Sequence, residues 1–254
     1  MSSISMKNKA FFKNLKAAKH PTAQECERFI SDRANLSVVD DEGNTALSLA
    51  AWYGKLDIVD MLIRAGADMN VVGGRLKGTA LLGAVVNEHP DVAAMLIEAG
   101  ADVTIPNLYG TTVLMYAANN GYPEIVKMLI RVGTEVNRAD SHGMTTLMYA
   151  ARNGKVDALR VLTAAHADLN LTDSDGNTAL MYAARSGWVD AISVLIDAHA
   201  DLNLTNRDGN TALMAALLAA RVGAAQLLIE AGANVNVKLD GAHHSLHGSA
   251  GLSP

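Results

Sequence analysis

Three histidines near the end of the sequence come closest to the spacing of a metal site. His243, His244 and His247 would lie within one turn of each other if this segment were helical, and imidazole is a common metal ligand. Gly241 and Gly248 flank them, however, and glycine disfavours a stable helix. We therefore expect a flexible tail, and keep an enzyme or metal-binding protein that uses the His-rich tail as the disfavoured alternative.

Two further patterns resemble catalytic motifs without meeting their geometry. Asp140, Ser141 and His142 are the residue types of a hydrolase triad, but three consecutive residues in a turn do not converge on one reacting atom. The stretch 73–79 is glycine-rich like a phosphate-binding loop, but no lysine follows its last glycine. We therefore expect no enzyme activity, no catalytic residues, no metal and no cofactor.

Two glycosylation-like sequences and one cysteine also have structural explanations. Asn170 and Asn203 each begin an Asn-x-Thr sequence, but both belong to a column of asparagines that recurs along the chain: Asn70, Asn137, Asn170, Asn203 and Asn236. A structural role for that column is the simpler interpretation. Cys26, the single cysteine, lies on an apolar helix face and is expected to be buried rather than reactive.

Composition excludes several classes of protein. The chain has 254 residues, of which 50% are hydrophobic and 19% are charged, with a formal net charge of −5. This balance supports a sizeable core and argues against nucleic-acid binding, which requires clustered Lys and Arg. No apolar run approaches the roughly 20 residues of a membrane-spanning helix, so we expect no membrane insertion. No secretory signal is evident, and the expected location is the cytoplasm.

The chain repeats itself with a period of 33 residues. A Thr-x-Leu sequence recurs six times, and its leucines are Leu47, Leu81, Leu114, Leu147, Leu180 and Leu213. A glycine or histidine follows each leucine at a constant distance: Gly66, Gly100, Gly133, His166, His199 and Gly232. Two independent landmarks that keep one register indicate a solenoid of stacked units.

One unit, residues 173–203, shows how each repeat is expected to fold. Asp173 to Asn177 have the composition of a turn, and Thr178 is placed to cap the helix that follows. Gly187 ends this first helix, and Asp190 lies in the first turn of a second helix, where it interacts favourably with the helix dipole. Helices this short are marginal alone, so each unit depends on its neighbours.

These residues resemble the ankyrin-repeat family over roughly residues 38–237. The resemblance implies an all-α solenoid of helix-turn-helix units with short β-hairpin or turn tips. The usual Thr-Pro-Leu-His signature is altered, because alanine, valine or threonine replaces its proline and methionine most often replaces its histidine. The Leu-Met-Tyr-Ala-Ala form resembles bacterial ankyrin repeats.

The ends of the chain depart from the repeat. Residues 1–37 are expected to form a degenerate N-terminal capping repeat with a basic leader, whose apolar positions include Phe11, Phe12 and Phe29. Its lysines are interpreted as a solvated face, and contact with a membrane or an acidic partner is the alternative. They are Lys7, Lys9, Lys13, Lys16 and Lys19. Residues 38–237 form six repeats, and residues 238–254 form the flexible tail.

The resemblance implies that partner proteins bind to the hairpin tips and to the concave face of the first helices. Aromatic and arginine side chains are the usual anchors of such interfaces. Tyr116, Tyr149 and Tyr182 repeat identically, which favours stacking between repeats over ligand contact. The expected partner-binding residues are Trp52, Tyr53, Tyr109, Asn119, His142, Arg152, Arg185 and Trp188.

Two arginines within this set are our best candidate for recognition. Arg152 and Arg185 lie 33 residues apart in one column, and stacking would place them about 10 Å apart. Such a pair could clamp carboxylates of a partner, whereas the alternative is a pair of solvated surface residues.

The function predicted from these features is a non-catalytic protein–protein interaction module, acting as an adaptor, scaffold or inhibitor. The alternative is a bacterial effector that is exported and binds a host protein. We expect a monomer. The sequence does not identify the partner.

Overall fold

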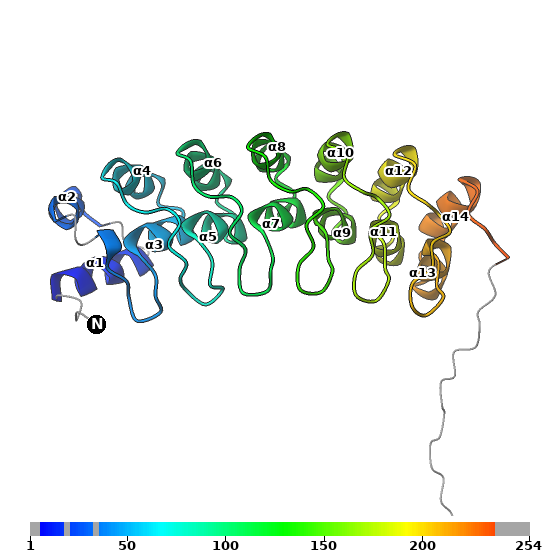
Figure 1. Cartoon of the computed structure of the whole chain (residues 1–254), viewed down its shortest axis with the longest axis horizontal. Helices are drawn as coiled ribbons and strands as arrows, with labels where there is room; N and C mark the ends of the chain where they lie inside the picture. Colours follow the sequence, from blue (N-terminus) through cyan, green and yellow to red (C-terminus); the bar gives the residue numbers. More distant parts are fainter. Residues whose placement is uncertain (1–5, 18–20, 33–35, 237–254) are drawn as a thin grey trace, which may run out of the picture.

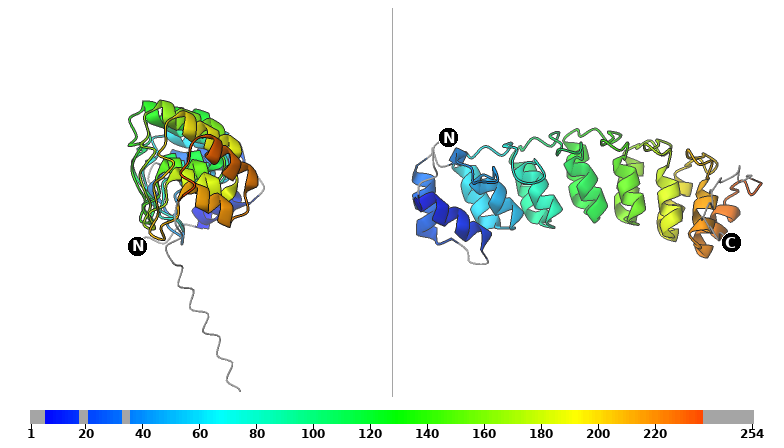
Figure 2. Two further views of the ribbon diagram at one scale, coloured as in Figure 1. Left: turned by 90° about the vertical axis from the view of Figure 1, so that its right-hand side faces the viewer. Right: turned by 90° about the horizontal axis from the view of Figure 1, so that it is seen from below.

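The structure is a single stack of helix pairs (Figure 1). This computed structural model describes residues 6–17, 21–32 and 36–236, and these ranges contain fourteen helices and no sheet. The helices form two rows, and the hairpin loops project beyond the inner row. Viewed along the stack, successive repeats overlie one another (Figure 2). This is the predicted all-α solenoid of helix-turn-helix units.

The two rows alternate along the sequence, one helix of each repeat in each row. The inner row comprises α1 (Met6–Lys16), α3 (Ala46–Trp52), α5 (Ala80–Val86), α7 (Val113–Asn120), α9 (Thr146–Arg152), α11 (Ala179–Ser186) and α13 (Ala212–Leu218). The outer row comprises α2 (Ala23–Ser31), α4 (Leu56–Arg64), α6 (Pro90–Glu98), α8 (Pro123–Arg131), α10 (Val156–Ala164), α12 (Val189–Asp197) and α14 (Val222–Glu230).

Each inner helix of the six repeats begins at the predicted threonine. The threonine hydroxyl accepts a hydrogen bond from the backbone N–H three residues later, at 3.1–3.4 Å in the six repeats. In repeats three to five a methionine at this third position returns the contact, as when the Met148 sulfur accepts from the Thr145 N–H at 3.4 Å. The sulfur thus takes the place of the carboxylate in a capping box, which gives the methionine column a local role.

The core is continuous because small residues let adjacent inner helices approach closely. The residues Ala50, Ala84, Ala117, Ala150 and Ala183 are fully buried in five successive inner helices, α3 to α11. Larger side chains such as Leu129 fill the space between the outer and inner rows. Each inner helix packs on the next inner helix, and from α4 onward each outer helix packs on the next outer helix. The core therefore runs along the whole stack.

The predicted asparagine column joins successive repeats. The side-chain oxygen of Asn70 accepts a hydrogen bond from the backbone N–H of Asp102 at 2.8 Å. Equivalent bonds, at 2.8–3.0 Å, are made by Asn137, Asn170 and Asn203. The structural interpretation of Asn170 and Asn203 is thus confirmed, because their side-chain oxygens bind the next repeat.

The hairpin tips are also joined by backbone hydrogen bonds. The Ser141 N–H donates to the Tyr109 carbonyl at 3.0 Å, the Ser174 N–H to the His142 carbonyl at 2.9 Å, and the Arg207 N–H to the Asp175 carbonyl at 2.9 Å. The first two hairpins meet through Gly73, where an added Cβ would lie 1.9 Å from the Gly43 carbonyl oxygen. The stretch 73–79 is therefore a hairpin packed on its neighbour.

The first helix pair packs through aromatic rings. The Phe11 and Phe29 rings stack with their centroids 4.2 Å apart, and Phe12 meets Phe29 edge-on at 6.1 Å. Cys26 is buried as expected, and burial raises the pKa of its thiol. A buried thiol that resists ionisation is a packing residue.

One lysine of the first helix pair differs from the expected solvated face. The Lys16 ammonium lies 2.8 Å from the Asp40 carboxylate at the first hairpin. Burial alone would raise the pKa of Asp40, but the bonds from Lys16 and Asn44 outweigh it and hold that pKa below its ordinary value. Lys16 therefore ties α1 to the first repeat.

Some expectations fall on residues that the structure leaves undescribed. Lys19 and the whole tail, residues 238–254 with its three histidines, lie outside the described residues. Within the described ranges, no helix combines the length and apolar character needed to cross a membrane.

Two histidines in the glycine column of the repeat adopt a left-handed backbone conformation. His166 has φ of 58° and His199 has φ of 67°, in the column where other repeats have glycine. A β-branched side chain is strained there, whereas glycine is not.

We predict that His166→Gly and His199→Gly leave the free energy of unfolding unchanged or slightly increase it. We expect His166→Val and His199→Val each to lower it by about 1–2 kcal/mol. Denaturant titration monitored by circular dichroism measures these values. His142→Val is the matched control, because His142 is exposed and is not left-handed. Equal stability of the glycine and valine variants would contradict the prediction.

Candidate protein-binding face

We use the term inner face for the surface formed by the hairpin tips and the inner helices. An Asp or Asn at the base of a hairpin fixes its shape in five of the six repeats. The Asp173 carboxylate accepts hydrogen bonds from the backbone N–H groups of Asp175 and Asn177, at 2.9 and 2.8 Å. The same turn is formed by Asp40, Asn107, Asp140 and Asn206. The conformation of each of these tips is thus fixed by hydrogen bonds between its backbone N–H groups and the side chain at its base.

A tyrosine from the following helix binds each turn in the third, fourth and fifth repeats. The Tyr149 hydroxyl donates to the Asp140 carboxylate at 2.6 Å, and the Tyr182 hydroxyl donates to Asp173. In the third repeat the Tyr116 hydroxyl accepts from the Asn107 amide at 3.3 Å. The repeated tyrosine therefore joins helix and hairpin within its own repeat, whereas we had expected stacking between repeats.

Two of these tyrosines have strongly raised pKa values. Burial, followed by the hydrogen bond to Asp140, raises the pKa of Tyr149 to about 12. Burial and Asp173 raise the pKa of Tyr182 to about 12 in the same way. A phenolate beside a carboxylate in a partly buried site is doubly unfavourable.

The two candidate arginines lie over these tyrosine rings. The Arg152 guanidinium carbon is 5.1 Å from the centroid of the Tyr149 ring, and that of Arg185 is 4.9 Å from the centroid of the Tyr182 ring. Both side chains are exposed, and neither forms an ion pair with any described residue. Each ring orients one cation on the inner face and leaves its N–H groups facing solvent.

Two other candidate residues have contacts that fix the stack. The Trp188 indole N–H donates to the Arg152 carbonyl at 3.0 Å, and so closes the end of α9. Trp188 nevertheless remains 47% exposed. The Asn119 side-chain oxygen accepts from the Asn153 amide at 2.8 Å. These side chains are positioned by neighbouring repeats.

The hairpin-tip candidates have exposed side chains. Tyr109 is 50% exposed, and His142 is also exposed. The Ser141 hydroxyl lies 3.3 Å from the Nδ1 atom of His142, but the Asp140 carboxylate binds backbone N–H groups and Tyr149 instead of the imidazole. The Asp-Ser-His sequence is therefore a structured turn. Among the described residues, no group of three or more His, Cys, Asp or Glu side chains gathers in a way that could hold a metal.

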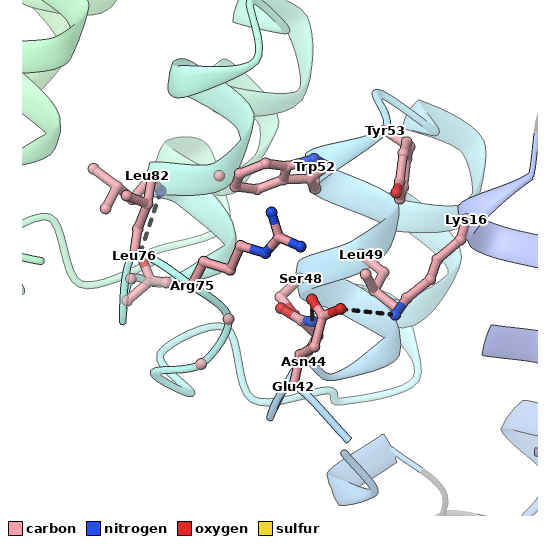
Figure 3. A pocket seen from close by; sticks show the side chains of 15 residues that line it. Lys16, Glu42, Asn44, Ser48, Leu49, Trp52, Tyr53, Arg75, Leu76 and Leu82 are labelled. Atoms are coloured by element: carbon pink, nitrogen blue, oxygen red, sulfur yellow. Dashed lines mark hydrogen bonds and ion pairs between the residues drawn. The ribbon is translucent and has the colours of Figure 1, made fainter. Parts of the chain in front are cut away.

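Trp52 and Tyr53 line a hollow of about 260 Å³ between the first and second repeats (Figure 3). Trp52 extends toward α5, and Arg75 from the second hairpin reaches across the hollow toward the indole. The backbone of Gly83 lies beneath the Trp52 ring, since a Cβ added at Gly83 would be 3.5 Å from it. The hollow is open because this glycine has no side chain.

The repeats that form the inner face match sequence models of a known protein family. A model of three consecutive ankyrin repeats matches residues 81–173 and 147–238, and a model of a single ankyrin repeat matches residues 42–73. These matches cover most of the chain. The chain belongs to the ankyrin-repeat family.

Individual relatives share only a few repeats with this ankyrin-repeat protein. It is 35% identical to ankyrin repeat and SAM domain-containing protein 6 of Rattus norvegicus over 81 residues. This stretch is 32% of this chain and 9% of that protein. It is 38% identical to ankyrin repeat and KH domain-containing protein mask-1 of Caenorhabditis elegans over 79 residues. This stretch is 31% of this chain and 3% of that protein. It is 30% identical to the human palmitoyltransferase ZDHHC13 over 91 residues. This stretch is 36% of this chain and 15% of that protein.

The chain thus corresponds to a small part of the length of each of these relatives. The named relatives are animal proteins, and the similarity to bacterial ankyrin repeats stays a prediction.

The partner-binding residues expected from the sequence of this ankyrin-repeat protein did not include Gly83 or Arg75. The signal was present, because Gly83 occupies the tyrosine column, which reads Leu49, Gly83, Tyr116, Tyr149, Tyr182 and Ala215. The repetition of tyrosine in this column is informative, and so is its interruption at Gly83. The position of Arg75 depended on how the second hairpin packs, which sequence spacing does not give.

We predict that Tyr149 and Tyr182 lose their protons about two pH units later than ordinary tyrosines. In the unfolded chain they titrate near pH 10, and in the folded protein near 12. Their contribution to stability is therefore complete below pH 10 and is lost as the pH rises toward 12. Ultraviolet absorbance of phenolate, measured against pH, should show a late phase whose amplitude falls by two tyrosines in the Tyr149→Phe, Tyr182→Phe double variant. The pKa values of Tyr116 and Tyr122 are also raised by burial, so these two residues contribute to what remains. A late phase of unchanged amplitude in the double variant would contradict this assignment.

Proposed function

We propose that this protein is a non-catalytic interaction module that binds a partner protein along its inner face. Membership of the ankyrin-repeat family supports a role in protein interaction. The observation that carries the finer proposal is the pair Arg152 and Arg185, each held over a tyrosine ring with no acidic partner among the described residues. Surface cations that are ordered but not neutralised by their own chain are suited to binding carboxylates.

The recognised segment of the partner is acidic. Arg152 and Arg185 occupy the same position in adjacent repeats, so their guanidinium groups lie about 10 Å apart. Successive side chains on one face of an extended peptide are separated by about 6.6 Å, so carboxylates two to four residues apart would reach both arginines. The tyrosine rings reduce the rotational freedom of the cations, which lowers the entropic cost of binding.

A second contact lies toward the amino-terminal end of the inner face. Trp52 occupies the same column as Arg152 but three repeats earlier, a distance of about 30 Å. An extended chain covers this distance with roughly nine residues. A single peptide segment could therefore contact both Trp52 and the arginines, with Tyr109 and His142 beside it at the hairpin tips.

Catalysis is not part of this proposal. One relative is named as a palmitoyltransferase, but the shared stretch covers only 15% of that protein, and its activity is not transferred to this chain. We further propose that the protein acts as a monomer in the cytoplasm, on the basis of its acidic composition and single cysteine. The adaptor, scaffold or inhibitor role depends on the partner.

We predict that the double variant Arg152→Glu, Arg185→Glu binds acidic peptides at least tenfold more weakly than the wild type. The probe is a fluorescent Gly/Ser peptide that carries three glutamates at alternate positions, and fluorescence anisotropy measures its affinity. Charge reversal converts attraction to repulsion, and a tenfold loss corresponds to about 1.4 kcal/mol.

The matched control is Arg131→Glu, Arg160→Glu. These arginines are exposed on the outer helices α8 and α10. Replacing them with glutamate changes the net charge by the same amount as the Arg152→Glu, Arg185→Glu variant. We expect this control to reduce affinity by less than about threefold, because it acts only through the overall charge. Equal losses in the two double variants would show that binding follows net charge, and would refute a site at Arg152 and Arg185.

A further inference from the structure

The hollow beside Trp52 exists because one repeat lacks a side chain that three others have. In the third, fourth and fifth repeats a tyrosine extends from the inner helix to the base of the hairpin. In the second repeat Gly83 takes the place of that tyrosine. Gly73 stands at the Asp or Asn position, because its N–H donates to the Gly78 carbonyl as the Asp140 N–H donates to the Met144 carbonyl. Both halves of the tyrosine-to-hairpin contact are therefore missing.

The sixth repeat supports this explanation of the hollow. There Ala215 takes the place of the tyrosine, and a second hollow of about 260 Å³ lies beside it. Ala215 and Tyr182 both line that hollow. Two repeats with a small residue in this column thus have an open space where other repeats place a phenol ring.

The hollow in the second repeat is lined by a guanidinium group and side-chain oxygens, the kinds of group that contact Tyr149 in the fourth repeat, although here they come from other positions of the repeat. Arg75 reaches across it, as Arg152 lies over Tyr149, and Arg75 has no hydrogen bond or ion pair among the described residues. Glu42 and Asn44 from the first hairpin line its floor and offer oxygen atoms to a hydroxyl group. The half-buried Trp52 provides a flat apolar wall.

We propose that this hollow is a socket for one tyrosine side chain of the partner protein. The inserted ring takes the place of the missing tyrosine, with Trp52 against its face and the Arg75 guanidinium near its centre. Its hydroxyl donates to Glu42 or to the Asn44 side-chain oxygen, as Tyr149 donates to Asp140. This inference deepens the proposed function and rests on it, since it specifies what the amino-terminal part of the inner face recognises.

The test uses N-acetyl-tyrosinamide, a neutral probe with one phenol ring. The chain has two tryptophans, so its indole N–H signals in nuclear magnetic resonance spectra are two. Trp52 lines the socket, whereas Trp188 is bound to Arg152 three repeats away and serves as the reference. We expect the Trp52 signal to shift saturably with an affinity on the order of millimolar, and the Trp188 signal to remain in place.

Two related probes and three variants locate the binding. N-acetyl-phenylalaninamide should bind several-fold more weakly because it lacks the hydroxyl, and N-acetyl-leucinamide more weakly still. Gly83→Tyr fills the socket from within and should abolish the shift. Gly83→Ala adds only a methyl group at an ordinary contact distance from Trp52 and should preserve it. Ala215→Tyr places the same tyrosine in the sixth repeat and should also preserve it.

The outcomes separate this inference from the proposed function. The probe is neutral, so the Arg152→Glu, Arg185→Glu variant should bind it as the wild type does, even if acidic peptides bind elsewhere. A Trp52 signal that does not shift in the wild type, or shifts equally in Gly83→Tyr, would overturn the socket. If Gly83→Tyr does not fold, Arg75→Glu decides, because losing the cation should weaken binding of the probe by about threefold or more. An unchanged affinity in Arg75→Glu would also overturn it.

Discussion

Burial of helix faces between adjacent repeats is the interaction on which the whole structure depends. The inner helices of the repeats have seven or eight residues and the outer helices nine, lengths at which an isolated helix is unstable in water. They persist because residues such as Ala150 and Leu162 are fully buried between neighbours. Stability in such a stack is a sum of local terms and nearest-neighbour contacts. The caps and turns of each repeat and the contacts between adjacent repeats place constraints on sequence, and the remaining surface is free to vary.

This freedom explains how one position serves two purposes. In the fourth and fifth repeats the tyrosine column fastens the hairpin to its helix and orients an arginine on the inner face. In the second repeat the same column holds Gly83 and leaves a hollow. The stack tolerates the loss because the threonine cap and the buried alanines remain. The tyrosine column strengthens a repeat without being essential to it, so a smaller residue in that column can leave a hollow while the repeat still folds.

The carboxylates at the hairpin bases interact mainly with groups of their own repeat. Asp40, Asp140 and Asp173 each accept hydrogen bonds from backbone N–H groups of their own hairpin. The pKa of Asp173 lies below its ordinary value because these bonds and the Tyr182 hydroxyl outweigh the effect of burial. The acidic residues at the hairpin bases are thus occupied by the fold. The arginines at the ends of α9 and α11 are not, so the inner face offers positive charge although the chain as a whole is acidic.

The sequence alone determined the repeat, its period and its caps, because these features depend on residues close together in the chain. Thr178 caps α11 through an N–H three residues away, and His166 takes its left-handed conformation from its place at a helix end. The tertiary structure alone decided which side chains meet across repeats. Lys16 reaches Asp40, Trp188 reaches Arg152, and Arg75 faces Trp52. Periodicity gives the column of each residue but not the direction of its side chain, since that direction is set by the packing of the neighbouring repeat. The hollow at Gly83 is such a case, because an absent side chain becomes a space only when the residues around it are in place.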